Sequence, residues 1–314
     1  MTGQDRIDVH SHVVPPFWAE QLDSYGGDHS GTMTPTWWSP NGAIAFMDSQ
    51  SIATSILSLT APNVVGWPDD ERPDIARRVN EYTANLVTNR PDRFGMFATL
   101  PLPDIDASLH AIEYAFDTLR ADGILMLSNI NGRYAGDSYL EPVWAELDRR
   151  HAIVFLHPAQ PQLPLAAGEA APLIDYPFDT TRAAVQMVLT GVTRRYPNVR
   201  VILAHAGGFL PYIAHRVAEL NKVFDKNSLT TEELLDQCRR FYVDTALSTS
   251  PAALPTLTAF MPHDHILFGS DNPYAPPEVS GIFTSHLDEA SLTTEDAAAI
   301  NRGNALALFP RLAT

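Results

Sequence analysis

The chain has 314 residues, 45% of them hydrophobic, and a net charge of −16. This acidic balance argues against nucleic-acid binding, because phosphate neutralisation needs clustered lysine and arginine. No apolar run is long enough to span a membrane, the first residues do not resemble a signal peptide, and the single cysteine excludes an intrachain disulfide. We therefore expect one cytoplasmic domain over residues 1–314, with no membrane partner.

Short apolar runs alternate with helical patterns along the chain, which is typical of a parallel α/β fold. The predicted strands are Ile7–His10, Ala53–Leu59, Phe94–Thr99, Gly123–Leu127, Ile153–His157, Val201–His205, Phe241–Asp244 and Ile266–Gly269. The predicted helices are Pro73–Arg90, Asp104–Arg120, Leu140–Arg150, Phe178–Tyr196, Leu210–Phe224, Thr231–Arg240, Pro251–Met261 and Thr293–Leu308. Eight such units favour a closed (β/α)₈ TIM barrel, with an open doubly wound sheet as the alternative.

One segment after the first strand interrupts this alternation. Residues 13–41 contain Trp18, Trp37 and Trp38 together with several prolines. We interpret them as an insertion after strand 1, either a lid over the barrel or a surface excursion fixed by its aromatic side chains. A second proline-rich loop is expected at Pro158–Pro177.

A His-x-His pair ends the first strand. His10 and His12 are two positions apart, so on a strand their side chains point to the same face. They also lie at the C-terminal end of the strand, where barrel active sites are built. The spacing alone is weak evidence, because His263 and His265 repeat it before the last strand, at the opposite face. We expect that second pair to belong to a polar loop without a metal.

Further polar groups end strands in the same way. They are His157, His205, Asp244 and Asp271. A hydrogen-bonded core residue would explain any one of them, but not the whole set. Three histidines and one aspartate are ligands that Zn²⁺ prefers, with room left for a water molecule. The predicted ligands are His10, His12, His157 and Asp271. His205 is then free to act as an acid or base, unless it is a fifth ligand or supports the other ligands.

Three other polar or reactive residues receive separate interpretations. Asp8 shares the face of His10 but lies deeper in the barrel, so we expect a structural, hydrogen-bonded role. Asp244 either supports the ligands or belongs to the packing. Cys238 lies on a helical pattern and is expected to be an inert buried thiol.

These residues resemble the amidohydrolase superfamily, and within it the branch of aminocarboxymuconate-semialdehyde decarboxylase and related aromatic-acid decarboxylases. The matching segments are Ile7–His12, Phe155–Pro158, Ala204–Gly208, Phe268–Asp271 and Asn301–Ala305. They occur in family order and span nearly the whole chain. Phe178–Arg182 and the tryptophan-rich segment further resemble proteins related to 6-methylsalicylate decarboxylase.

The resemblance implies a (β/α)₈ barrel, commonly a homodimer. It also implies one metal bound by the four predicted ligands, with His205 as the neighbouring catalytic acid or base. Some resorcylate-type decarboxylases replace the first histidine of the motif with glutamate and use Mn²⁺. This chain keeps both histidines, and nitrogen-rich ligation favours Zn²⁺, with Mn²⁺ as the alternative.

Two absences narrow the chemistry that the resemblance implies. Binuclear amidohydrolases bridge their metals with a carboxylated lysine after strand four, but Lys222 and Lys226 are the only lysines of this chain. Mononuclear deaminases carry a glutamate three residues after the strand-six or strand-five histidine. Gly208 and Gln160 stand at those positions. One metal and a reaction other than deamination are therefore expected.

The expected reaction is non-oxidative decarboxylation of a small aromatic, hydroxybenzoate-like or conjugated unsaturated carboxylic acid, with release of CO₂. The metal would bind the substrate carboxylate, and either His205 or Asp271 would deliver the proton. Arg133 is the predicted substrate-binding residue, because a guanidinium fork fits a carboxylate, although it could be a surface arginine. A metal-dependent hydrolase of an amide or lactone is the alternative, followed by a barrel that only binds metal or ligand.

Overall fold

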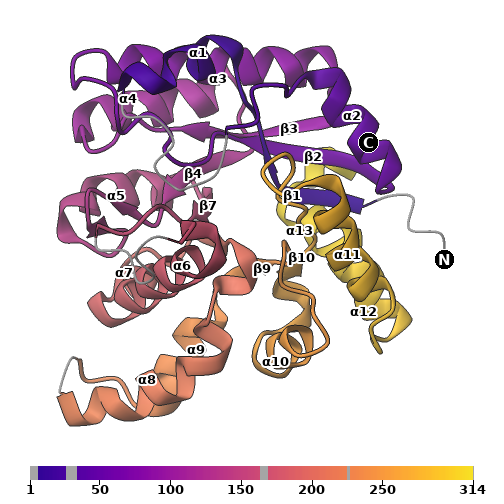
Figure 1. Cartoon of the computed structure of the whole chain (residues 1–314). Coiled ribbons are helices and arrows are strands. Elements are labelled where there is room, and N and C mark those ends of the chain that lie inside the picture. Colours follow the sequence, from indigo (N-terminus) through magenta and orange to yellow (C-terminus); the bar gives the residue numbers. More distant parts are fainter. Residues whose placement is uncertain (1–5, 26–33, 163–168, 225–226, 314) are drawn as a thin grey trace.

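The computed structural model describes residues 6–25, 34–162, 169–224 and 227–313. Eight parallel strands occupy its centre, and each pairs with the next along the chain (Figure 1). They are β1 (Arg6–His12), β2 (Ile52–Ser58), β3 (Phe94–Thr99), β4 (Gly123–Leu127), β7 (Ile153–His157), β8 (Arg200–Leu203), β9 (Tyr242–Asp244) and β10 (Ile266–Leu267). All eight predicted strands are confirmed, with bounds that differ by only a few residues.

The sheet closes between its first strand and the segment that follows its last one. The Val9 amide donates to the Phe268 carbonyl at 3.0 Å, and the Asp271 amide donates to the His10 carbonyl at 2.8 Å. Ser11 and Asn272 form a further parallel bridge. The predicted (β/α)₈ barrel is therefore confirmed, and the open sheet is excluded.

The strands are buried on both faces, where the side chains are apolar or form hydrogen bonds within the protein. Every residue of β1, β3, β4 and β7 is buried, as expected for parallel strands covered on both sides. Inside this core the ring of Phe155 lies 5.4 Å from that of Phe97, which lies 5.9 Å from that of Phe309 near the C-terminus. These rings fill the barrel beneath the strand ends that carry the polar cluster.

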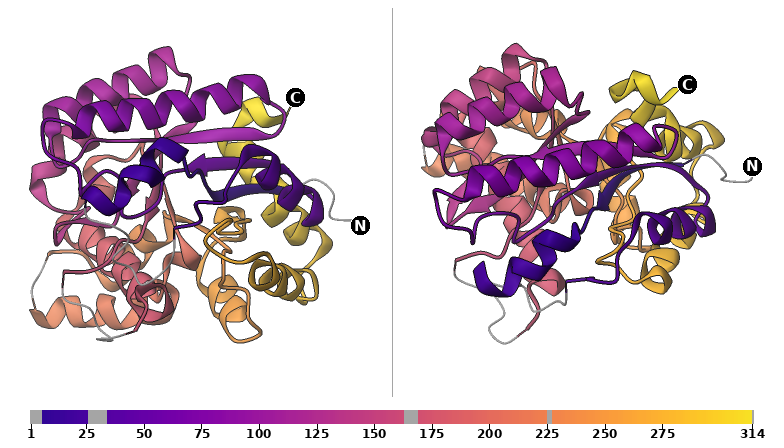
Figure 2. Two further views of the ribbon diagram at one scale, coloured as in Figure 1. Left: turned by 45° about the horizontal axis from the view of Figure 1, so that its top comes forward. Right: turned by 90° about the horizontal axis from the view of Figure 1, so that it is seen from above.

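Helices cover the outside of the barrel (Figures 1 and 2). They are α3 (Arg72–Asn89), α4 (Ile105–Glu113), α5 (Glu141–Arg149), α6 (Ala171–Thr190), α7 (Val192–Arg195), α8 (Leu210–Phe224), α9 (Thr231–Arg239), α10 (Ala253–Phe260), α11 (Pro277–Asp288), α12 (Thr294–Ala298) and α13 (Asn304–Leu308). Side-chain caps fix several starts. The Asp104 carboxylate accepts the Ala107 amide at α4, and Thr230 with Glu233 forms a capping box at α9.

Three helices were not predicted, and one begins earlier than expected. The insertion contains α1 (Pro16–Leu22) and α2 (Pro40–Ser49), and α11 follows the last strand. The loop expected at Pro158–Pro177 ends at Ala171, where α6 begins with a proline in its first turn. Proline suits that position because its missing N–H would be unpaired anyway. Pro177 lies inside the same helix.

The described part of the insertion behaves as a surface excursion fixed by aromatic side chains. Trp18 is fully buried, its ring lies 6.1 Å from that of Trp67, and its indole N–H donates to the Asn63 carbonyl at 2.9 Å. Trp38 is also buried, whereas Trp37 is exposed. The remainder of the predicted lid, residues 26–33, lies outside the described residues.

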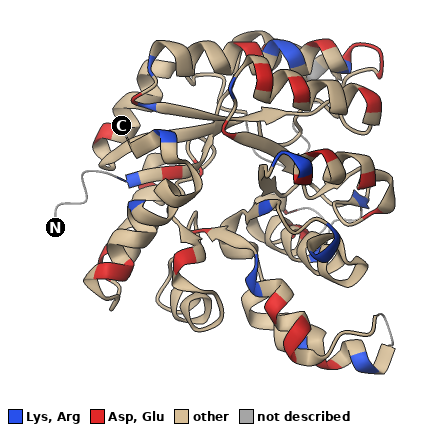
Figure 3. Ribbon diagram, turned by 180° about the vertical axis from the view of Figure 1, so that it is seen from behind, with Lys and Arg blue, Asp and Glu red and all other residues tan. Residues whose placement is uncertain are grey.

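Charged side chains of both signs are mixed over the outer helices (Figure 3). Among the described helices, none combines the length and apolar character that crossing a membrane requires.

Candidate metal centre

Strand β1 brings two imidazoles to the same side of the barrel. His10 and His12 alternate with outward-facing residues, and both are fully buried. Their ring centroids lie 5.0 Å apart. Because His10 and His12 are two positions apart on this strand, their imidazoles lie side by side as a pair of nitrogen donors.

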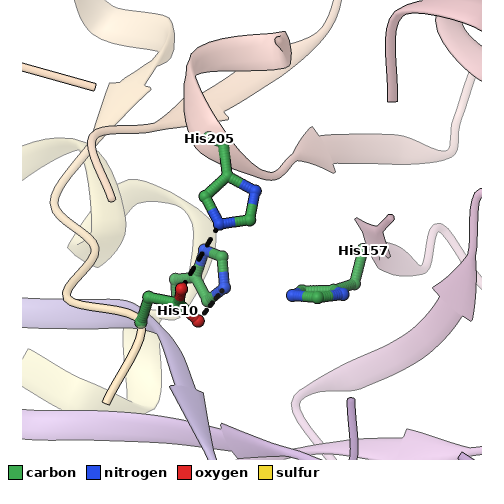
Figure 4. Close-up of side chains that lie close together, drawn as sticks. His10, His157 and His205 are labelled. Atoms are coloured by element: carbon green, nitrogen blue, oxygen red, sulfur yellow. Dashed lines mark hydrogen bonds and ion pairs between the residues drawn. The ribbon is translucent and has the colours of Figure 1, made fainter. Parts of the chain in front are cut away.

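Two further histidines approach from β7 and β8, the fifth and sixth strands in the order of the barrel. His157, the last residue of β7, has its ring 5.1 Å from that of His10 and 5.0 Å from that of His12. His205 directly follows β8 and Ala204, and its ring lies 4.8 Å from that of His10. Figure 4 shows the side chains of His10, His157 and His205 converging from different strands on one space.

Asp271 completes the cluster from the turn after β10. Its Oδ1 lies 3.0 Å from Nε2 of His12 and 3.2 Å from Nε2 of His10, and its Oδ2 lies 3.5 Å from Nε2 of His205. Asp271 and His205 both adopt positive φ, 61° and 54°. These left-handed turns bend the chain away from the strand ends and aim both side chains into the cluster.

The structure therefore brings together all five residues of the predicted centre. The four whose donor atoms lie within 4.8 Å of one another are His10, His157, His205 and Asp271. This set differs from the predicted ligand set in one member, because it contains His205 in place of His12. The geometry leaves either histidine able to serve as the fourth ligand.

Hydrogen bonds behind the cluster fix the ring orientation of three imidazoles and which of their nitrogens carries the proton. Nδ1 of His10 lies 2.8 Å from the Asp244 carboxylate, Nδ1 of His157 lies 2.8 Å from the Pro158 carbonyl, and Nδ1 of His12 lies 3.0 Å from the Ser58 hydroxyl. Acceptors such as carboxylate and carbonyl oxygens require the proton on Nδ1, which leaves Nε2 as a lone-pair donor.

The donor set fits a divalent metal ion. Nε2 of His10 is buried without a hydrogen-bond partner among the described residues, and so is Nδ1 of His205. Buried polar atoms without partners are rare in folded proteins, so the unpaired Nε2 of His10, inside a group of four ligand-type side chains, indicates a place for an ion. Imidazole nitrogens and one carboxylate oxygen are ligands that Zn²⁺ and related ions accept.

The electrostatics of the cluster make it hold positive charge. Burial acts to lower the pKa of His10, but the Asp244 and Asp271 carboxylates on either side raise it to about 10. Burial acts to raise the pKa of Asp271, but His10 and the hydrogen bonds from the surrounding imidazoles hold it well below its usual range. Burial and the neighbouring histidines keep the pKa of His157 well below its ordinary value. The two carboxylates therefore favour positive charge beside His10.

Asp8 and Asp244 hold residues of the cluster in place through hydrogen bonds. Asp8 accepts the amides of His10 and Ser270 at 3.0 and 3.1 Å, which ties β1 to the last strand, and burial raises its pKa to about 7. Asp244 accepts the His205 amide at 3.0 Å with one oxygen and holds His10 with the other. Asp244 is thus linked to two histidines of the cluster.

A cavity of about 260 Å³ opens next to the cluster. His157, His205 and Asp271 line it, whereas His10 and His12 lie beneath. The other walls are mostly apolar or aromatic: Ala61, Pro172, Leu173, Tyr176, Pro177, Leu247, Tyr274, Ala275, Pro276 and Val279, with Thr60 and Ser248. Among these described residues there is no lysine or arginine.

Arg133 does not reach this cavity. It lies on β6 (Arg133–Tyr134), which pairs with β5 (Asn129–Ile130) in a small antiparallel hairpin, and its side chain is half exposed. Its guanidinium pairs with Asp137 at 2.9 Å and lies 3.7 Å from the ring centroid of Tyr139. The hairpin turns the side chain outward, so the structure gives no support to the predicted carboxylate clamp.

The remaining sequence interpretations concern residues away from the centre. His263 pairs with Asp296 at 2.9 Å, and the ring of His265 stacks on Tyr242 at 4.1 Å, both before β10 at the opposite end of the barrel. Cys238 is buried on α9, and burial raises the pKa of its thiol to about 12. Neither the second His-x-His pair nor the thiol approaches the cluster.

Several residues at the site were not predicted. The Thr60 hydroxyl lies 2.9 Å from Nδ1 of His157, and the ring of Tyr274 lies 5.4 Å from that of His12. The buried Asp179 accepts hydrogen bonds from the Tyr134 hydroxyl, from Ser128 and from the Ala159 amide, and so holds the chain just after His157. Thr60 follows a strand end like the histidines and could have been found by that signal.

The chain is similar to proteins that are named as decarboxylases of aromatic carboxylic acids. The chain is 40% identical to 6-methylsalicylic acid decarboxylase of Penicillium expansum, over 98% of this chain and 97% of the relative. A solved amidohydrolase II structure superposes with a TM-score of 0.90 at 33% identity, over 97% of this chain and 99% of that one. A 2,6-dihydroxybenzoate decarboxylase solved with 2,6-dihydroxybenzoate gives 0.78 at 25% identity, over 99% and 100%. Matched from residue 7 to residue 311 by the amidohydrolase family model, the chain belongs to the amidohydrolase family.

Proposed function

We propose that this chain is a metal-dependent non-oxidative decarboxylase of a small aromatic, hydroxybenzoate-like acid, and that it releases CO₂. The observation that carries the proposal is an apolar cavity that meets the histidine cluster and offers no cationic side chain among its described lining residues. Among these described lining residues, the cluster alone can neutralise a carboxylate inside the cavity. The decarboxylase relatives named above support an aromatic acid as the substrate class.

The proposed metal ligands are His10, His12, His157 and Asp271. A divalent cation held there would supply a Lewis acid that neutralises the substrate carboxylate. Nitrogen-rich ligation makes Zn²⁺ our first choice and Mn²⁺ the second. A homodimer is part of the same proposal.

The two proposed proton donors, His205 and Asp271, face the cavity. Either group can place a proton on the ring carbon that bears the carboxylate, and the bond to CO₂ then breaks as its electron pair restores the aromatic ring. The walls formed by Leu247, Tyr274 and Val279 cover the ring with apolar surface and limit access of water.

The test follows the fate of solvent atoms. In D₂O the product of decarboxylation should carry one deuterium at the carbon that lost its carboxylate and none elsewhere on the ring, as measured by NMR and mass spectrometry. CO₂ release from hydroxybenzoates should match product formation one to one. Unlabelled ring product, or solvent oxygen in a newly formed carboxylate, would instead identify an amide or lactone hydrolase.

A further inference from the structure

The imidazole of His157 is oriented by a backbone carbonyl, whereas that of His10 is oriented by a carboxylate. Nδ1 of His10 lies 2.8 Å from the Asp244 carboxylate, and Nδ1 of His157 lies 2.8 Å from the carbonyl oxygen of Pro158. The Thr60 hydroxyl lies 2.9 Å from the same nitrogen, but a hydroxyl can donate or accept and does not decide where the ring proton sits. The Pro158 carbonyl can only accept, so it is the group that keeps the proton on Nδ1.

The carbonyl of Pro158 belongs to the same peptide unit as the amide N–H of Ala159. This peptide bond is trans, so the unit is a rigid plane whose C=O and N–H point in opposite directions. The N–H donates to the Ser128 hydroxyl at 3.0 Å and, at the longer distance of 3.4 Å, to the Asp179 carboxylate. Holding the N–H on one side of the plane therefore directs the carbonyl on the other side toward His157.

Asp179 is completely buried on α6 and anchors the Ser128 hydroxyl. Ser128 donates its proton to Oδ2 of Asp179, so its lone pairs remain to accept the Ala159 amide. Oδ2 also accepts Nδ2 of Asn129 at 2.8 Å, and Oδ1 accepts the Tyr134 hydroxyl at 2.7 Å. The hydrogen-bond chain thus runs in one direction, from the imidazole through the peptide and the hydroxyl to the carboxylate.

We propose that Asp179 is a positioning residue of the metal site, and that it acts on His157 through this hydrogen-bond chain. Hydrogen bonds in a chain polarise one another, so negative charge at one end makes the Pro158 carbonyl a stronger acceptor. A stronger acceptor at Nδ1 keeps the proton there and makes Nε2 a better lone-pair donor to a cation. The inference rests on the metal site proposed above, but not on the reaction that takes place there.

The first measurement is the affinity of the full-length protein for Zn²⁺, obtained by competition with a chelator. Asp179→Asn keeps the shape of the side chain but removes its charge and one acceptor, and Ser128→Ala breaks the chain in its middle. Each should weaken Zn²⁺ binding by about tenfold to a hundredfold, the usual effect of removing a group that supports a ligand histidine. Because both changes act along one chain, the double variant should bind Zn²⁺ about as weakly as Asp179→Asn alone.

A second measurement needs no metal. In metal-free protein with isotope-labelled histidine, nitrogen NMR should show the proton of neutral His157 on Nδ1, and Asp179→Asn should shift part of the population to Nε2. This result is independent of turnover. If the wild type shows both results as expected but decarboxylates no hydroxybenzoate, only the proposed function is contradicted.

Asp122→Asn is the matched control, because it removes a buried carboxylate from the opposite end of the barrel. The Asp122 side chain is 4% exposed, pairs with Arg311 and accepts the Met96 amide at 2.8 Å. This variant should lower the free energy of unfolding but leave the Zn²⁺ affinity and the His157 tautomer unchanged. Unchanged Zn²⁺ affinity in folded Asp179→Asn or Ser128→Ala, or an equal loss in Asp122→Asn, would assign Asp179 a purely structural role and overturn the proposal. If Asp179→Asn does not fold, Ser128→Ala alone decides between these outcomes.

Discussion

His205 and His12 differ in their access to the cavity, and we propose different roles for them. His205 lines the cavity, whereas His12 is fully buried beneath it. We expect His205→Asn to keep the metal and to lower kcat by about 10²–10⁴-fold, because the proton-transfer group is lost while the four proposed ligands remain. Metal content and kcat measured on one preparation check this expectation.

His12→Ala is the matched comparison, and it should lose both metal and activity. The opposite pattern is chemically possible, because the donor atoms of His205, and not those of His12, lie in the tight group with His10, His157 and Asp271. A metal-free His205→Asn protein beside a metal-loaded His12→Ala protein would assign His205 as a ligand and contradict our proposal.

Gly208 shapes the turn that carries His205. It has a φ of +63°, and a Cβ added there would lie 2.0 Å from the Pro177 carbonyl oxygen, which is backbone and cannot move aside cheaply. We expect Gly208→Ala to lower the free energy of unfolding by about 2–4 kcal/mol through strain and overpacking. Gly303→Ala is the control, because its Cβ would meet nothing closer than 3.8 Å, and it should be neutral or slightly stabilising in urea denaturation. Equal stabilities of the two variants would contradict this reading of the turn.

Strand-end position was enough to predict the five residues of the centre, because closing a parallel barrel gathers the C-terminal ends of all strands. Residues such as Tyr274 and Tyr176 could not be predicted in the same way. Their place at the cavity depends on the path of the loop after β10 and on the early start of α6, which no sequence periodicity encodes. Arg133 was misplaced for a related reason: a short hairpin, invisible as a pattern, turns it toward Asp137.

At the scale of elements, the contact between the turn before β10 and helix α12 should depend on pH. The hydrogen bond and charge of Asp296 raise the pKa of His263 above its ordinary value of 6.5. The contact therefore contributes stability fully below about pH 6.5, and this contribution is lost as pH rises through the raised pKa of the folded state. Urea denaturation of the wild type and of His263→Gln should differ most near pH 5.5 and converge by pH 9.

A difference that stays constant across this range would show that His263 acts through packing rather than charge. Because the side chain is 41% exposed, solvent screening keeps the expected effect small, at about a few tenths of a kcal/mol. NMR titration of the His263 ring gives an independent measure of its pKa.

The helices illustrate what patterns along the chain can and cannot predict. Helix α8 has the predicted bounds, Leu210–Phe224, because its apolar periodicity is uninterrupted. Helix α11 was not predicted, although Pro277 lies in its first turn, where proline is favourable for a helix. Tertiary packing decides such cases, and a single sequence does not display it.

For the whole molecule, metal removal should lower stability as well as activity. Elemental analysis should give close to one Zn²⁺ or Mn²⁺ per chain. A metal present at 100 times its Kd stabilises the folded state by about 2.7 kcal/mol, so chelation should lower the Tm by several degrees and re-addition should restore it. Two bridged metals in a crystal, or a Tm insensitive to chelation, would contradict a single metal that joins β1 to the last strand.

The contacts that close the barrel, between β1 and the segment after β10, determine when this centre can form during synthesis. These contacts join residues 259 positions apart, between His12 and Asp271, and 262 apart, between Asp8 and Ser270. On the ribosome the first two imidazoles emerge long before the carboxylate that completes their cluster, and contacts so distant in sequence form slowly. With the proposed ligand set, the complete metal site would form only after the segment that carries Asp271 has been synthesised and has met β1.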